Sequence, residues 1–276
     1  MADKLENHHC VFVGGILQCA HHSIDQMLTH ETDIMASMIG EAETPDQVKE
    51  PSLRRYLDIC MKIVQEDPSS IATFMPTLKD MYEKDPCEIL MGLFDNKSWQ
   101  GVEKNFTVQF QFENVRSTSS SPTDRLPIKE SIITVPLNTE IPLPGMQQYF
   151  LKSINSIDPA GYMKRIDTVS NYLLLSLMVY DHKNGVSVKT YPQHLNIHTL
   201  MNMSINTITD GKVSYRLRGM IVHQGSNVGS GHYYYVLFDD KLRQWSFDDQ
   251  VGKVVQRNME SFSTKECPYM LLYKKI

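Results

Sequence analysis

Gly231-His232-Tyr233-Tyr234-Tyr235, followed thirteen residues after the histidine by Trp245-Ser246-Phe247-Asp248-Asp249, is the stretch that decides the fold. A histidine opens one aromatic, β-rich run, and a pair of carboxylates closes the next one. Two antiparallel strands joined by a short turn can bring such a histidine and carboxylate side by side. A general base and its orienting group need this juxtaposition, so the pattern predicts half of a nucleophilic catalytic site.

The overall composition is that of a globular protein. The 276 residues are 41% hydrophobic and 21% charged, with a formal net charge of −5. This acidic balance disfavours nucleic acid or an anionic membrane as the partner. No run of about 18 apolar residues occurs, and the first residues contain no apolar signal core, so we expect no membrane span and a cytoplasmic or nuclear protein.

The cysteines are scattered and odd in number. An odd count without close spacing argues against a disulfide framework, and the lack of a Cys-x-x-Cys pair argues against a zinc ribbon. We therefore expect no metal site and no cofactor, but at least one free thiol that can act as a nucleophile. The five are Cys10, Cys19, Cys60, Cys87 and Cys267.

Helical patterns fill the first hundred residues. Apolar residues recur at helical spacing through residues 10–28 and again through residues 71–81. A capping signature at residues 44–47 starts another helix, and residues 87–93 form a short one.

Strand patterns dominate after Trp99. Residues 106–112 alternate strictly between apolar and polar, whereas residues 172–180 form a continuous apolar run that predicts a fully buried strand. A turn is expected at 181–185, and a short helix at 142–154. Further strands are expected at 131–137, 186–191, 215–223, 232–238, 243–247 and 269–274. Helices first and strands second, without βαβ alternation, predict an α+β fold.

Several ordered motifs of the C-terminal half resemble the ubiquitin-specific protease family of deubiquitinating cysteine peptidases. The resemblance continues upstream, where Leu17-Gln18-Cys19 is similar to part of the helix that carries the family's nucleophile. The motifs are Tyr215-x-Leu217, His223-x-Gly225, Gly231-His232-Tyr233, Trp245-x-Phe247-Asp248-Asp249, Tyr269-Met-Leu-Leu-Tyr273, Lys189 with Tyr191-Pro192, and residues 84–90.

This resemblance implies a papain-like right-hand fold. The chain would be one domain over residues 1–276, with a helical thumb at 1–98 and the fingers and palm at 99–276. The family's fingers usually hold a zinc ion between two cysteine pairs, which this sequence lacks. The fingers are therefore expected to be metal-free, or reduced to the strands at 106–112 and 131–137.

The resemblance also implies a reaction, which is cleavage after the C-terminal glycine of ubiquitin or a ubiquitin-like protein. His232 would be the general base, Asp248 its orienting partner and Asp249 a supporting carboxylate. The substrate channel would be lined by Gly225, Gly231 and Tyr233. The chain is short for this family, so a regulatory or scaffold protein partner is expected beside ubiquitin.

The nucleophile is harder to place. The family's cysteine lies seven residues before the glutamine of a Leu-Gln pair, and counting back from Gln18 reaches Val11. Cys10 is one residue upstream and is predicted as the nucleophile, with Asn7 supporting the oxyanion. The alternative for Cys10 is a small residue at the start of a core helix.

Two functional hypotheses follow. In the first, Cys10, His232 and Asp248 make the chain a thiol-dependent deubiquitinase. In the second, Val11 occupies the nucleophile's place, and the chain is an inactive pseudo-enzyme that binds other proteins as a scaffold.

The other histidines and tyrosines of these motifs receive structural roles. The pairs His8-His9 and His21-His22 are predicted to be solvated or capping rather than metal ligands, because adjacent helical residues point about 100° apart. Tyr234 is expected to pack inward, with Tyr233 and Tyr235 at the edge of the substrate channel.

Overall fold

The computed structural model describes residues 19–40, 54, 57, 85–115, 125–137, 142–183, 186–227, 230–251 and 253–276. These residues divide into two compact units. The first holds the described residues up to Glu103, Gly219–Gly225 and the described residues from 230 to Asn258, and the second holds the rest. Within the described ranges, no helix combines the length and the apolar character needed to cross a bilayer.

The helices of the first unit pack through apolar faces. In α2, Ala20, Ile24, Met27 and Leu28 are buried at the spacing of one helical face. This part of the predicted 10–28 helix is confirmed, whereas its earlier residues lie outside the described chain. The helices are α2 (Cys19–Thr29), α3 (Thr32–Gly40), α6 (Pro86–Phe94), the 3-10 helix η2 (Lys97–Trp99) and α7 (Gln100–Glu103).

Helix α6 confirms the short helix predicted at 87–93. Asp85 precedes it, and the Asp85 carboxylate accepts a hydrogen bond from the Cys87 backbone N–H at 2.7 Å. Pro86 occupies the first turn, where a missing N–H costs nothing. The helices expected around residues 44–47 and 71–81 fall outside the described residues.

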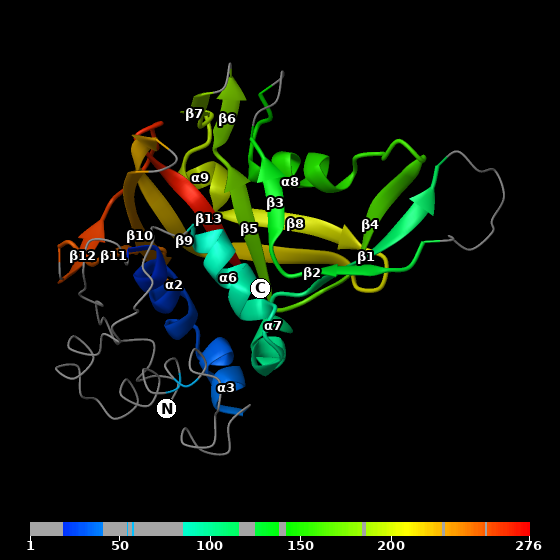
Figure 1. Cartoon of the computed structure of the whole chain (residues 1–276), viewed down its shortest axis with the longest axis horizontal. Helices are drawn as coiled ribbons and strands as arrows, with labels where there is room; N and C mark the ends of the chain where they lie inside the picture. The colour runs from blue at the N-terminus through cyan, green and yellow to red at the C-terminus, as the bar shows by residue number, and fades with distance from the viewer. Residues whose placement is uncertain are drawn as a thin grey trace. The chain divides into compact units, whose positions relative to one another are not determined.

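A hairpin forms the other half of the first unit. Strands β10 (Ser230–Phe238) and β11 (Gln244–Asp248) pair antiparallel, with Tyr235 opposite Phe247, and β12 (Lys253–Arg257) continues the sheet beyond β11. The Asp239 carboxylate closes the turn by accepting hydrogen bonds from the backbone N–H groups of Lys241 and Arg243, both at 2.9 Å. In Figure 1, α2 lies beside this hairpin, and it contacts both β10 and β11.

Strand β9 (Gly211–Asn227) contributes residues to both units. In the first unit the strand order is β12-β11-β10-β9, and in the second it is β9-β13-β5-β3, with β8 (Asn202–Thr207) also pairing β9. Strand β5 (Tyr172–Met178) lies between β13 (Glu266–Lys275), which is antiparallel to it, and β3 (Ile133–Pro136), which is parallel. All residues of β5 except its last are buried, which confirms the predicted buried strand.

A smaller sheet of the second unit has the order β2-β1-β4. Its strands are β2 (Ile128–Glu130), β1 (Val108–Asn114) and β4 (Tyr162–Val169). The strand predicted at 106–112 is β1, but the strand predicted at 131–137 is β3, which pairs with β5. The expectation that these two strands alone make up reduced fingers is therefore wrong, because β1 takes β2 and β4 as its partners.

Strand β4 escaped prediction because its outward residues are charged. Lys164 forms an ion pair with Glu130 of β2, and Arg165 forms one with Glu113 of β1 at 2.7 Å. Such cross-strand pairs stabilise a sheet without leaving an apolar alternation in the sequence.

The remaining elements of the second unit are short. Helix α8 (Met146–Ile154) confirms the helix predicted at 142–154, and α9 (Ile197–Leu200) starts with a capping box between Asn196 and Thr199. The turn predicted at 181–185 is partly wrong, because β6 (Tyr180–Lys183) runs through it and pairs with β7 (Val186–Lys189).

Substitution of Gly231 tests the packing of the first unit's hairpin. A Cβ at Gly231, where φ is +151°, would lie 2.4 Å from His223 Nε2 and 2.6 Å from the Gln224 carbonyl oxygen. Gly231→Ala should lower the free energy of unfolding by more than about 3 kcal/mol, because strain and overlap add. Urea unfolding monitored by circular dichroism measures it.

The matched controls separate strain from overlap. Gly211→Ala meets open space at φ +70° and should cost about 1 kcal/mol, whereas Gly92→Ala in α6 should stabilise by about 0.5–1 kcal/mol. Equal costs at Gly231 and Gly211 would contradict the close packing of His223.

Candidate active site

The predicted histidine and aspartate meet in the first unit. His232 Nε2 lies 2.8 Å from Asp248 Oδ1, and the two residues are only 6% and 7% exposed. An ionised carboxylate can only accept, so Nε2 carries the proton and donates it. The Gln250 backbone N–H donates a second hydrogen bond to the same oxygen, at 3.0 Å. The imidazole is therefore held in one orientation, with Nδ1 on its free side.

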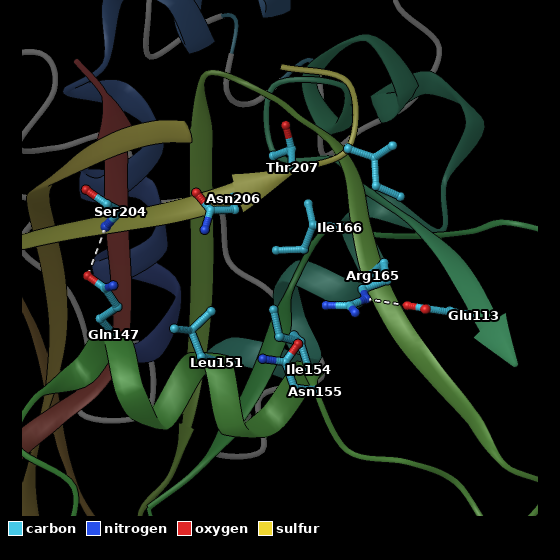
Figure 2. Close-up of a pocket in the computed structure, with 11 residues that line it drawn as sticks. Glu113, Gln147, Leu151, Ile154, Asn155, Arg165, Ile166, Ser204, Asn206 and Thr207 are labelled. Carbon is cyan, nitrogen blue, oxygen red and sulfur yellow. Dashed lines mark hydrogen bonds and ion pairs between the residues drawn. The ribbon is translucent and has the colours of Figure 1, made fainter. Parts of the chain in front are cut away.

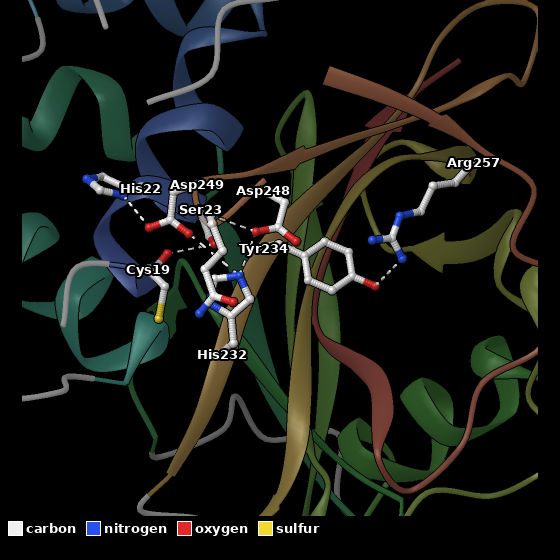
Figure 3. A network of polar contacts seen from close by, with 9 residues as sticks. Cys19, His22, Ser23, His232, Tyr234, Asp248, Asp249 and Arg257 are labelled. Atoms are coloured by element: carbon white, nitrogen blue, oxygen red, sulfur yellow. Dashed lines mark hydrogen bonds and ion pairs between the residues drawn. The ribbon is translucent and has the colours of Figure 1, made fainter. Parts of the chain in front are cut away.

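Helix α2 brings a thiol to this imidazole, and the thiol belongs to Cys19. Cys19 is the first residue of α2, is 6% exposed and is a free cysteine. Figure 3 shows the Cys19 side chain near His232, with the Ser23 hydroxyl donating to the Cys19 carbonyl oxygen at 2.8 Å. The cysteine, histidine and aspartate thus come together from one helix and two strands.

The electrostatics of His232 reflect both neighbours. Burial lowers the pKa of the ring, but the hydrogen bond to Asp248 and the nearby Cys19 thiol outweigh burial and raise the pKa to about 10. Nδ1 is buried and has no acceptor or donor within ordinary hydrogen-bond distance. The Cys19 thiol therefore lies close to the ring but outside hydrogen-bond distance of Nδ1.

The Asp248 carboxyl is shifted in the complementary direction. Burial raises its pKa, but the His232 hydrogen bond and charge, together with the backbone N–H groups of Gln250 and Val251, lower it overall. At neutral pH the pair is thus a carboxylate and an imidazolium.

A second histidine–aspartate pair adjoins the first. His22 Nδ1 lies 2.8 Å from Asp249 Oδ2, and both side chains are 5% exposed. The other Asp249 oxygen, Oδ1, lies 3.6 Å from His232 Nε2. The prediction that His22 is solvated or capping is therefore wrong, because α2 turns this side chain toward the end of β11.

The Tyr234 ring packs on the His232 imidazole. Tyr234, two residues along β10 on the same face, stacks on it with ring centroids 6.3 Å apart. The Arg257 guanidinium covers Tyr234 at 4.9 Å from the ring centroid. Tyr234 is buried, as predicted, but Tyr235 is also buried, so its expected place at a channel edge is wrong.

The glycines near His232 have a structural task. Gly225 and Gly231 both have positive φ, at +139° and +151°, and their backbones approach each other so closely that a Cβ on Gly225 would lie 3.0 Å from Gly231 Cα. Tyr233 is half-buried and its ring contacts His223 at 4.8 Å. Their predicted part in a substrate channel stays a prediction.

Cys19 is not among the nucleophiles predicted from the sequence, although the sequence contains a signal for it. Cys10 and Asn7 lie outside the described residues, as does Val11, so their roles stay predictions. Gln26 follows Cys19 by seven residues, which is the cysteine-to-glutamine spacing of the resemblance. Because Asp25 rather than a leucine precedes Gln26, the count started from Gln18 instead.

The Cys267 thiol, in contrast to that of Cys19, has no imidazole described beside it. In the second unit Cys267 is fully buried, and burial raises its pKa to about 11 although Lys189 partly opposes this. Burial in turn lowers the pKa of Lys189. A thiol kept protonated in this way is a poor nucleophile.

A cluster of possible metal ligands and a pocket are two further candidate binding sites, but neither contributes to a thiol-based reaction. His232, Asp248 and Asp249 are close enough to hold a metal ion, yet the His232 Nε2 proton is already donated to Asp248. A pocket of about 450 Å³ lies in the second unit between α8, β4 and β8 (Figure 2). Its charged lining residues, Glu113 and Arg165, neutralise each other, and among the described residues no cysteine or histidine lines it.

Comparison with known proteins gives one family match and one curated relative. The family model described as ubiquitin carboxyl-terminal hydrolase matches residues 16–273. Ubiquitin carboxyl-terminal hydrolase 26 of Arabidopsis thaliana is 24% identical over 164 residues, which cover 56% of this chain. The match spans only 14% of the Arabidopsis protein.

Solved structures show the same fold at low identity. A chain of the Ubp8-Sgf11-Sgf73-Sus1 SAGA DUB module matches 100% of this chain and 69% of its own length, with a TM-score of 0.71 and 15% identity. The module bound to monoubiquitin gives a TM-score of 0.65 at 14% identity, over 99% of this chain and 70% of the other. The yeast module with an Sgf73 substitution gives 0.61 at 17%, over 99% and 67%.

Asp248→Asn should change the titration of His232. The wild-type ring should stay protonated at pH 8 and titrate near pH 10, whereas the variant should titrate at a clearly lower pH, since burial remains and the nearer of the two carboxylates is lost. NMR of ¹⁵N-labelled histidine measures both. Asp210→Asn, at an exposed carboxylate of the second unit, should leave the titration unchanged.

The same substitution should make stability less dependent on pH. The folded pKa of His232 lies above its unfolded value, so the stabilisation is complete below about pH 6.5 and is lost as the pH rises through about 10. Asp248→Asn should therefore cost more at pH 6 than at pH 10.5. An equal cost at both would contradict the ion pair.

Proposed function

Because the chain belongs to the ubiquitin carboxyl-terminal hydrolase family, we propose that it is a thiol-dependent deubiquitinase in which Cys19 is the nucleophile. The observation that carries the proposal is the Cys19 thiol beside an imidazole whose far nitrogen is held by Asp248. This arrangement supplies a nucleophile, a base and an orienting group within one packed unit. The papain-like fold of the family positions the three.

The proposed reaction assigns one step to each of the three residues. Cys19 Sγ attacks the carbonyl carbon of the substrate's C-terminal glycine and forms a C–S bond. His232 gives its proton to the departing amine as the C–N bond breaks. Water then attacks the thioester, His232 takes the water's proton, and the glycine carboxylate leaves as the thiolate is restored. Asp248 holds the ring in one orientation throughout.

The substrate is proposed to be ubiquitin or a ubiquitin-like protein joined through its C-terminal glycine. The family and the module bound to monoubiquitin support this choice. The predicted support of the oxyanion by Asn7 belongs to the register with Cys10 as the nucleophile, so it is not part of the proposal for Cys19. The scaffold alternative depended on Val11 in the nucleophile's place, and the spacing from Cys19 to Gln26 supports the hydrolase instead.

Ubiquitin carrying a C-terminal electrophile should test the nucleophile directly. Wild type should become covalently labelled, and Cys19→Ala should abolish labelling and lower hydrolysis of a fluorogenic ubiquitin substrate by about 10³-fold or more. Intact-mass spectrometry and peptide mapping locate the adduct.

Cys10→Ala and Cys87→Ala are the matched controls and should label normally. Labelling that is lost in Cys10→Ala but kept in Cys19→Ala would overturn the assignment of Cys19. Ubiquitin binding without any labelling of the wild type would establish the scaffold alternative.

We also propose a regulatory or scaffold protein partner. The SAGA modules that share this fold contain Sgf11, Sgf73 and Sus1, and the sequence lacks the paired cysteines of zinc-bound fingers. Affinity purification of the full chain at native abundance, followed by size-exclusion chromatography, should give a complex larger than the chain. Recovery of the monomer alone would contradict this proposal.

A further inference from the structure

We propose that His22 is a positioning residue that fixes the Asp249 carboxylate between helix α2 and the imidazole of His232. The proposal rests on the proposed function, because its effect is on the Cys19–His232 pair. His22 does not touch the reacting atoms in the structure. It acts through Asp249, which ends in the space between the two histidines (Figure 3).

The contact between His22 and Asp249 is a buried, charge-assisted hydrogen bond. His22 Nδ1 and Asp249 Oδ2 are 2.8 Å apart, and each side chain is 5% exposed. Since a carboxylate only accepts, the proton lies on His22 Nδ1. Hydrogen bonds to a charged group at this burial are stronger than neutral ones.

The second oxygen of Asp249 shows why the His22–Asp249 hydrogen bond, here called the anchor, affects His232. Oδ1 is buried, has no hydrogen-bond donor and lies 3.6 Å from His232 Nε2. Asp248 Oδ1 occupies the nearer position, at 2.8 Å from the same nitrogen. Two carboxylates thus face one N–H group, and the one bound by His22 is kept at the longer distance.

Without the anchor, the arrangement has two ways to relax. Asp249 can rotate toward Nε2 and compete with Asp248, which would turn the imidazole and move Nδ1 away from the thiol. Alternatively, it can rotate toward water and remove its negative charge from the imidazolium. Both lower the rate of the chemical step rather than the binding of ubiquitin.

The anchor also connects the nucleophile to the strand that orients the base. Cys19 and His22 are three residues apart on α2, so they lie on neighbouring positions of one helix surface. Asp249 follows the last residue of β11 directly. The His22–Asp249 contact therefore fixes the first turn of α2 against the end of β11 and helps set the distance between the thiol and the imidazole.

Substitutions of His22 can distinguish its two ring nitrogens. An asparagine side-chain amide can place its N–H close to the position of Nδ1, whereas glutamine reaches toward the position of Nε2. Under the proposal, His22→Ala and His22→Gln should each lower kcat by about tenfold with little change in KM. His22→Asn should recover most of the wild-type kcat.

A double-mutant cycle tests whether His22 acts through Asp249. Asp249→Ala should lower kcat by a similar factor, and the His22→Ala/Asp249→Ala double variant should be no slower than the slower single variant. Thermal unfolding of every variant shows whether it is folded, and if His22→Ala is unfolded, the His22→Asn and His22→Gln pair decides. The assay is hydrolysis of a fluorogenic ubiquitin substrate.

Several results would overturn the proposal: multiplicative losses of kcat in the double variant, a wild-type kcat for His22→Ala, or recovery by glutamine but not asparagine. NMR of ¹⁵N-labelled histidine separates this test from the proposed function. The wild type should show His22 protonated at Nδ1, and His22→Ala should shift the His232 ring resonances. These signals are expected even if Cys19 fails to react with the ubiquitin electrophile, and unchanged His232 resonances would overturn the positioning role.

Discussion

The buried hydrogen bond from His232 Nε2 to Asp248 Oδ1 is the interaction on which the candidate site depends. A ring as buried as this one would lose its charge without a partner, because burial disfavours the imidazolium. The carboxylate reverses that preference and also selects which nitrogen is engaged. Only then does Nδ1 face the Cys19 thiol. The antiparallel register of β10 and β11, closed by the Asp239 turn, brings the two residues within reach.

Adjacent carboxylates allow one strand end to serve two histidines. Asp248 binds the imidazole on β10, and Asp249 binds His22 on α2. Unpaired, two buried carboxylates next to a reactive thiol would repel each other and raise the free energy of the folded state. With a histidine for each, the same charges attach the helix to the hairpin. The site is consequently a packed part of the first unit, in which each of the two carboxylates has a histidine partner.

Prediction from the sequence succeeded where one pattern had one structural solution. The apolar run of β5 could only be buried, and Asp85-Pro86 could start a helix at α6 with both a cap and a suitable first turn. Prediction failed where polar residues are stabilised by partners distant in the chain. The charged residues of β4 pair with Glu113 of the adjacent strand β1 and with Glu130 of β2 on the far side of β1, and His22 binds an aspartate 227 residues away. Local periodicity contains no trace of such pairs.

The sequence by itself determined the α+β order of elements, the His232–Asp248 hairpin and the family, because strand alternation and turn residues are local properties that short segments already express. Tertiary structure alone decided which thiol meets the imidazole. Two glutamines offer two registers for the first helix, and the dipeptide Leu17-Gln18 favours a count of seven that reaches Val11 rather than Cys19. The packing of α2 on β10 favours Cys19, because a candidate nucleophile is recognised by the base that lies beside it, and that base is more than 200 residues further along the chain.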